Sequence, residues 1–332
     1  MKNAQISEKA PGRTSMVWKK LNNSEFRSYS GLVLVILVVS TFLSFRSPNF
    51  LTQQNLLNVL RQISVYGILA CGQAFAMMTG GIDLQVGSVA GLCGAIVTQM
   101  VVKDIMSLVP SMLVGMVIGA ALGAFAGFMI AKTGIPAFIM TLGLQISLRG
   151  VAYLVCDGRP IGNLPDNMLN LGVGTVFGIP IPILFMLAAF VVIGVILSRT
   201  SFGRSVYAVG GNYQAAHHSG INAKRVITLA YMISGILAAL AGVILSARNA
   251  SAQPTAGNAF ETEAIAACAM GGVSFSGGKG AVVGIFLGAL LMGIINNGMN
   301  LMYISSYWQL VVKGAIIIAS VLYSIYSTSK KR

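Results

Sequence analysis

The chain has 332 residues, of which 55% are hydrophobic and only 9% are charged, and its formal net charge is +14. A soluble domain contains roughly 25% charged residues, so this composition excludes an ordinary soluble protein. A nucleic-acid surface needs a continuous basic face, and long apolar runs separate most of the basic residues here.

Long apolar runs dominate the chain, and a run of about 20 such residues crosses a bilayer as a helix. Strands of a membrane barrel would alternate polar and apolar residues, and these runs do not. The sequence therefore predicts an all-α polytopic membrane protein with about ten transmembrane helices, and we expect no cofactor. The predicted spans are residues 29–45, 63–79, 86–102, 111–131, 136–155, 182–198, 226–246, 263–276, 280–300 and 307–326.

Basic residues indicate how these spans are oriented. Fifteen of the 22 lysines and arginines fall in segments that a cytoplasmic N-terminus places inside, and five fall outside. Short loops rich in Lys and Arg stay in the cytoplasm. We therefore expect a cytosolic tail at residues 1–28, a transmembrane domain at residues 29–326, and a cytosolic tail at residues 327–332.

The segment between the first two spans, residues 46–62, is too polar to cross the membrane. Leu51, Leu56, Leu57 and Leu60 predict a short amphipathic helix on the outer surface. Further on, residues 157–180 form the longest predicted external loop.

Two glycine-rich stretches interrupt apolar sequence, Thr79–Gly87 and Gly271–Gly280. A broken backbone at membrane depth must be buried in protein or line a water-filled cavity, so each stretch is a candidate hinge beside a pathway. The alternative for the first is an ordinary tight turn in which Asp83 caps the next helix. The second stretch does not fit a phosphate-binding loop, because Val273 stands where that pattern needs its first glycine.

Glycines also recur every fourth residue at 115, 119, 123 and 127, and again at 280, 284 and 288. Such stripes let membrane helices approach closely, either inside one chain or in a dimer. The two stripes are offset by 165 residues, which favours an inverted repeat of five plus five spans, although chance similarity is the alternative.

Several polar side chains lie within predicted spans. Arg149 and Lys313 could mark a functional site, but we favour side chains that extend to the membrane surface. Thr141, Gln145, Asn296 and Asn297 could bind a polar solute, but hydrogen bonds between helices are the simpler interpretation. The candidate pathway and hinge residues are Gly80, Gly81, Asp83, Phe138, Thr141, Gln145, Asn296 and Asn297.

A polar segment at residues 199–225 separates two apolar runs. It contains four basic residues, both histidines of the chain and no acid. Its charge places it in the cytoplasm, where it can contact a partner.

Four motifs resemble those of the ribose-type sugar permeases of ABC importers, in the order of that family. Residues 80–88 read GGIDLQVGS and resemble GGIDLSVGS, and residues 136–143 resemble PxFIxTLG. Residues 203–221 resemble GRxxYAxGGNxxAAxxxGI, and residues 261–280 resemble ELDAIAAxxxGGxSxxGGxG. The departures are Gln85, Thr262–Glu263 and Phe275, and residues 307–318 lean toward the methyl-galactoside members.

This resemblance implies a fold similar to that of the cobalamin-type permeases, in the bacterial inner membrane. It also implies a homodimer, a cytoplasmic ATP-binding subunit, a periplasmic sugar-binding protein and no enzymatic activity of the chain itself. Residues 199–225 would be the coupling loop to the ATPase, with Gly210 and Gly211 forming a turn before a short helix. The coupling residues would be Gly203, Arg204, Gly210, Gly211, Asn212, Ala215, Ala216 and Gly220.

Two other classes remain as alternatives. An ion-coupled secondary transporter usually needs acids at midplane, and acids are nearly absent from the predicted spans. An intramembrane enzyme needs a reactive set of side chains, and no such pattern occurs in the sequence. Which sugar is carried does not follow from these residues.

Overall fold

The computed structural model describes residues 25–329, so most of the predicted N-terminal tail and Lys330–Arg332 lie outside the described residues. Within that range the chain is predominantly helical, and every predicted span overlaps a helix, but the helix at residues 263–276 ends at Met270. The long helices of the first half are α2 (Glu25–Arg46), α3 (Gln53–Met78), α4 (Val86–Val102), α5 (Leu108–Thr133) and α6 (Ala137–Val155). Those of the second half are α8 (Ile181–Arg199), α11 (Ala223–Arg248), α12 (Phe260–Met270), α13 (Val282–Leu301) and α14 (Ser306–Ser329).

Six of these helices are long and apolar enough to cross a membrane by length and composition, namely α2, α5, α6, α8, α11 and α13. Helix α12 has 11 residues and is about 16 Å long at 1.5 Å per residue. A hydrocarbon core is about 30 Å thick, so α12 is too short to cross it alone.

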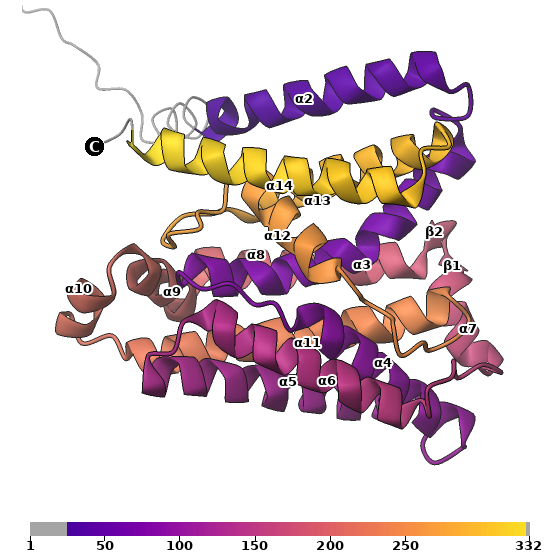
Figure 1. Ribbon diagram of the computed structural model, residues 1–332, viewed down its shortest axis with the longest axis horizontal. Helices are drawn as coiled ribbons and strands as arrows, with labels where there is room; N and C mark the ends of the chain where they lie inside the picture. Colours follow the sequence, from indigo (N-terminus) through magenta and orange to yellow (C-terminus); the bar gives the residue numbers. More distant parts are fainter. Residues whose placement is uncertain (1–24, 330–332) are drawn as a thin grey trace, which may run out of the picture.

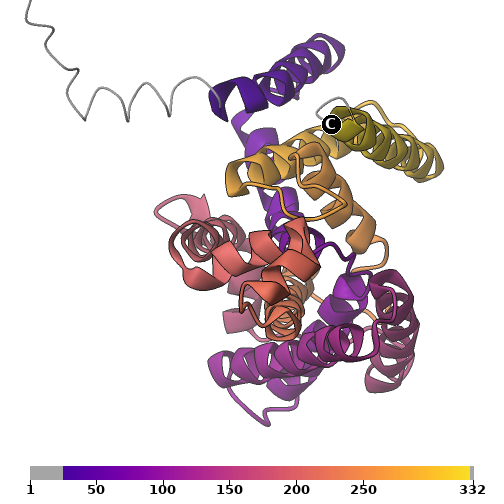
Figure 2. The same ribbon diagram turned by 90° about the vertical axis from the view of Figure 1, so that its left-hand side faces the viewer.

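Helix α11 packs against α3, α4 and α5, whereas α2, α13 and α14 lie on the other side of α3, away from α11 (Figures 1 and 2). Two short helices, α9 (Ser201–Gly211) and α10 (Tyr213–His218), lie at one end of the molecule (Figure 1). Helix α7 (Asp166–Val173) and strands β1 (Thr175–Val176) and β2 (Ile179–Pro180) lie at the opposite end. The polar segment at residues 199–225 and the predicted external loop are therefore on opposite ends, as the basic residues indicate.

Glycines allow these helices to pack at close range. A β-carbon on Gly119 or Gly123 would collide with backbone atoms of α11, at Gly235 and Tyr231. On α13, a β-carbon on Gly288 would collide with backbone atoms of α12. The interpretation of these stripes as packing within one chain is therefore confirmed for these positions.

Two predictions about the connections are wrong. No separate amphipathic helix forms at residues 46–62, because α3 begins at Gln53 and continues without a break to Met78. Thr52 caps this helix by accepting a hydrogen bond from the Asn55 amide at 3.3 Å. Residues 157–180 are also not a simple loop, because they contain α7 and an antiparallel hairpin that pairs Val176 with Ile179.

Candidate functional site

Three capped helix starts give the polar segment at residues 199–225 its shape. Thr200 accepts a hydrogen bond from the Gly203 amide at 3.0 Å at the start of α9, and Asn212 accepts one from the Ala215 amide at 2.9 Å at the start of α10. Asn222 does the same at the start of α11. Each cap bonds an amide that has no partner inside its helix, so a new helix can begin at each of these three residues.

The predicted coupling residues divide into an exposed and a buried group. The exposed residues are Arg204, Gly211, Asn212, Ala215 and Gly220. Ala216 is buried, and Gly203 packs against the backbone of α8, so neither can present a side-chain surface to a partner. The predicted turn at Gly210 and Gly211 is also wrong, because both residues end α9 and the chain turns at Asn212.

Helix α9 connects the exposed surface to both glycine-rich stretches. Gly210 lies directly against the Met78 carbonyl, which also accepts a hydrogen bond from the Gly278 amide at 2.9 Å. Tyr207 donates from its hydroxyl to the Gly280 carbonyl at 2.9 Å, and burial raises the pKa of this phenol, which keeps the donor protonated. A movement of α9 would therefore act on both breaks in the helical structure.

The first break, between α3 and α4, leads to a buried carboxylate. Asp83 is fully buried and accepts hydrogen bonds from the Ser234 hydroxyl at 2.8 Å and the Gln85 amide at 3.1 Å. In the orientation that satisfies its side-chain amide, Gln73 bonds both backbone groups of Asp83. Asp83 bonds the amide of Gln85, the residue that precedes α4, but it is not the cap of α4 that the tight-turn alternative predicted, because Gln85 occupies the N-cap position.

The other candidates near this break have different surroundings. Thr141 of α6 is buried, donates to the Ile82 carbonyl at 3.1 Å and accepts from the Leu84 amide at 3.1 Å, so it holds the break in place. Gly81 lies against the Tyr231 hydroxyl, and Gly80 is exposed. Phe138 is 52% exposed on the outside of α6.

A second buried carboxylate, Glu261, begins α12 beside α6. Gln145 donates to Glu261 at 2.8 Å, so this pathway candidate braces two helices. Arg149 donates to the Pro254 and Ala256 carbonyls at 2.9 and 2.6 Å. The expectation that Arg149 extends to the membrane surface is therefore wrong.

The third buried carboxylate, Glu263, binds α12 to the last two helices. It forms an ion pair with Lys313 of α14 and accepts a hydrogen bond from Asn296 of α13 at 3.2 Å. Lys313 thus points into the protein and not to the membrane surface, because Glu263 supplies the opposite charge there. Asn296 is a bridge between helices, which was the simpler of its two interpretations.

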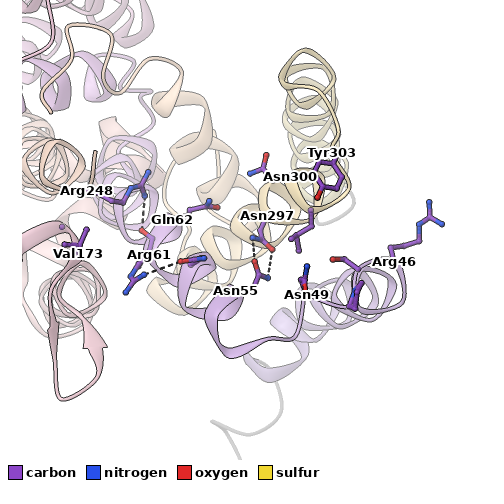
Figure 3. A pocket seen from close by; sticks show the side chains of 15 residues that line it. Arg46, Asn49, Asn55, Arg61, Gln62, Val173, Arg248, Asn297, Asn300 and Tyr303 are labelled. Carbon is purple, nitrogen blue, oxygen red and sulfur yellow. Dashed lines mark hydrogen bonds between the residues drawn. The ribbon is translucent and has the colours of Figure 1, made fainter. Parts of the chain in front are cut away.

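Asn297 lies at the base of a polar cavity of about 810 Å³ (Figure 3). Part of its lining comes from α7, which lies at the end of the molecule opposite α10 (Figure 1). Asn297 exchanges two hydrogen bonds with Asn55, at 2.8 and 3.0 Å. The helix ends of α2, α3, α11 and α13 all contribute side chains to this cavity.

The main omission from the sequence predictions is the pair Glu261 and Glu263. Of the eight acids of the chain only Glu263 falls within a predicted span, yet Asp83, Glu261 and Glu263 are all buried in the helical bundle. The signal was present in the sequence, since two acids two residues apart directly precede an apolar run. The predicted start of that span, at residue 263, placed them at its edge.

Comparison with known proteins gives near full-length matches. Residues 55–321 match the family described as branched-chain amino acid transport system / permease component. A ribose import permease protein of Bacillus subtilis is 45% identical over 89% of this chain and 90% of its own length. The D-allose and L-arabinose transport system permease proteins of Escherichia coli are 36% and 38% identical and cover 96% and 91% of this chain, with 95% and 92% of their own lengths matched. No solved structure gives a significant match.

Proposed function

The chain belongs to the family of branched-chain amino acid transport system permease components, and we infer that it is the permease subunit of an ATP-driven importer of a monosaccharide. The observation that carries this conclusion is the match to ribose, allose and arabinose permeases over about nine tenths of each chain. It is a multi-pass protein of the inner membrane, and a separate subunit hydrolyses ATP. A preference for methyl-galactoside stays a prediction.

The exposed end formed by α9 and α10 is the proposed contact with the ATP-binding subunit. Arg204, Asn212, Ala215 and Gly220 are available there, and both chain termini would lie on the same, cytoplasmic side. Because α9 contacts Met78 and Gly280, a push from the ATPase would reach the breaks that follow α3 and α12. Sugar would pass while these breaks move, and the chain itself would make or break no covalent bond.

We expect two copies of the chain to form the importer, with a periplasmic sugar-binding protein on the outer side. The inverted repeat of five plus five helices is supported by the packing. Under that repeat α3 corresponds to α11, α4 to α12, α5 to α13, and α6 to α14. The contact between α4 and α11 then corresponds to that between α12 and α3, and the contact between α5 and α11 corresponds to that between α13 and α3. The contact between α4 and α6 corresponds to that between α12 and α14.

The first experiment is to co-purify the chain with its ATPase, reconstitute the complex in lipid, and measure ATP hydrolysis with sugar-loaded binding proteins. Stimulation by one loaded binding protein would support the importer and identify its sugar. A chain that purifies alone and transports without ATP would contradict it.

The second candidate is an ion-coupled secondary transporter, and the three buried carboxylates favour it more than the sequence suggested. Such transporters bind coupling ions where helices are broken, and Asp83 lies in a break. Uptake that stops when the ion gradient is collapsed at normal ATP would identify this class.

A further inference from the structure

Several basic residues on the predicted outer side of the membrane lie around one cavity. Short basic loops normally stay in the cytoplasm, yet five lysines and arginines are predicted outside. Three of the five, Arg46, Arg61 and Arg248, line the cavity of about 810 Å³ (Figure 3). No aspartate or glutamate is among its lining residues within the described part of the chain. The positive-inside rule does not favour arginines on this side, so their convergence on one cavity is a candidate for ligand binding.

The arginines of the cavity retain donors that the protein does not use. Arg248 donates to the Arg61 carbonyl at 3.2 Å, and Arg61 donates to the Asn58 side chain at 3.4 Å. The Nε atom of Arg61 is buried without a hydrogen-bond partner in the described chain. Buried polar groups are normally satisfied, so these donors point to a polar ligand.

Hydrogen bonds hold the base of the cavity together. Asn55 and Asn297 exchange two hydrogen bonds, and Asn55 also donates to the Phe50 carbonyl at 2.8 Å. Both asparagines are buried, and they join the start of α3 to the end of α13. A ligand that binds above them does not have to order these groups, which lowers the entropic cost of binding.

The lining favours a neutral, polyhydroxylated ligand over an anion. Asparagine and glutamine side chains carry both a donor and an acceptor, as each sugar hydroxyl does. Asn49, Gln62 and Asn300 supply such groups around the arginines, and Tyr303 adds an exposed ring at the rim. An anion could use only the donors of this lining, whereas a sugar can use the donors and the amide carbonyls. The volume lies within the range of about 300–1,000 Å³ that is usual for small-molecule sites.

We propose that this cavity binds a monosaccharide on the outer side of the permease, with Arg61, Gln62 and Arg248 as its main ligand-binding side chains. This inference rests on the proposed function and adds a solute site within the permease itself, separate from the binding protein.

The test is saturation-transfer NMR on the assembled permease–ATPase complex in lipid nanodiscs, with millimolar D-ribose, D-allose or L-arabinose and no binding protein. One of these sugars should give a signal with the native complex. Arg61→Gln and Arg248→Gln should each weaken its binding by about tenfold or more, since a hydrogen bond from a charged donor is lost. Arg159→Gln is the matched control, because Arg159 is an exposed arginine predicted on the same side and outside the cavity.

Gln62→Leu gives a second variant that leaves the arginines in place, and thermal unfolding of every variant checks that it is folded. The proposal is overturned if none of the sugars gives a signal with the native complex, or if the variants bind sugar as the native complex does. It is also overturned if the variants lose affinity for the binding protein alone, which would make the cavity a docking surface. ATP-driven uptake by the native complex, measured in parallel, shows whether the proposed function itself holds.

Discussion

At the scale of single residues, the most informative finding is where the charges lie. Asp83, Glu261 and Glu263 are buried within an apolar bundle, although charge in a membrane is costly. Each has a different means of compensation. Asp83 accepts a hydrogen bond from the Ser234 hydroxyl, and Glu261 accepts one from the Gln145 amide. Glu263 forms an ion pair with the Lys313 ammonium. Polar side chains that looked like solute ligands are in several cases the partners of these acids.

The ion pair between Glu263 and Lys313 gives the first prediction. Lys313→Met leaves the Glu263 charge buried and unpaired, so we expect a loss of about 2 kcal/mol in the free energy of unfolding, below the usual cost because the lysine is partly exposed. Thermal unfolding in detergent measures it. The double variant Glu263→Gln with Lys313→Met should recover most of the loss, and equal stability of the single variant and the native chain would show that the pair contributes nothing.

At the scale of elements, α9 determines how the two breaks are held. It presents Gly210 to the carbonyl of Met78 and Tyr207 to the carbonyl of Gly280, so one short helix touches the segments that follow α3 and α12. The second contact needs the long side chain of Tyr207, whose hydroxyl is the donor. The first needs the absence of a side chain at Gly210.

Two adjacent glycines at the end of α9 therefore provide a matched test. A β-carbon at Gly210 would overlap the Met78 carbonyl oxygen, whereas one at Gly211 would meet nothing within 4 Å. Gly210→Ala should cost about 1–3 kcal/mol in the free energy of unfolding, and Gly211→Ala should leave it close to the native value. Denaturant or thermal unfolding of the purified chain compares them. Equal effects of the two changes would contradict the close contact.

At the scale of the whole molecule, the proposed coupling surface and the polar cavity lie at opposite ends. The end with α9 and α10 carries the exposed part of the predicted coupling residues (Figure 1), and helix ends on the opposite side of the molecule line the polar cavity (Figure 3). The helices between them pack through glycines and carry the three buried acids. Transport would thus require that a change at one end reaches the other through α9, the two breaks and the helices that follow them.

Gly220 tests the coupling surface on the assembled importer. It is exposed, but its φ of +82° means that any side chain there also strains the backbone. Gly220→Glu should abolish uptake while membrane insertion stays normal, because a bulky charge would block docking of the ATPase. Gly220→Asn is the control, since asparagine tolerates this conformation, and it should retain most uptake. Normal uptake by the glutamate variant would remove the coupling assignment, and equal loss in both would assign the effect to the backbone.

The sequence by itself determined the class of protein, the family and the approximate positions of the long helices, but not the start of α3 or the presence of α7. Apolar runs are local and long, and the motifs are read residue by residue, so none of these conclusions needs contacts between distant segments. It also identified the two glycine-rich breaks and the polar segment between α8 and α11, although it misplaced the turn that Asn212 makes.

Only the tertiary structure decided which side chains meet. Glu263 and Lys313 are 50 positions apart, and Gln145 and Glu261 are more than a hundred apart, so neither pair leaves a local pattern in the sequence. The same holds for the three arginines that share the outer cavity, because they come from the ends of different helices. An isolated charge in an apolar run looks as if it must reach water, and only the packed bundle shows that its partner lies inside.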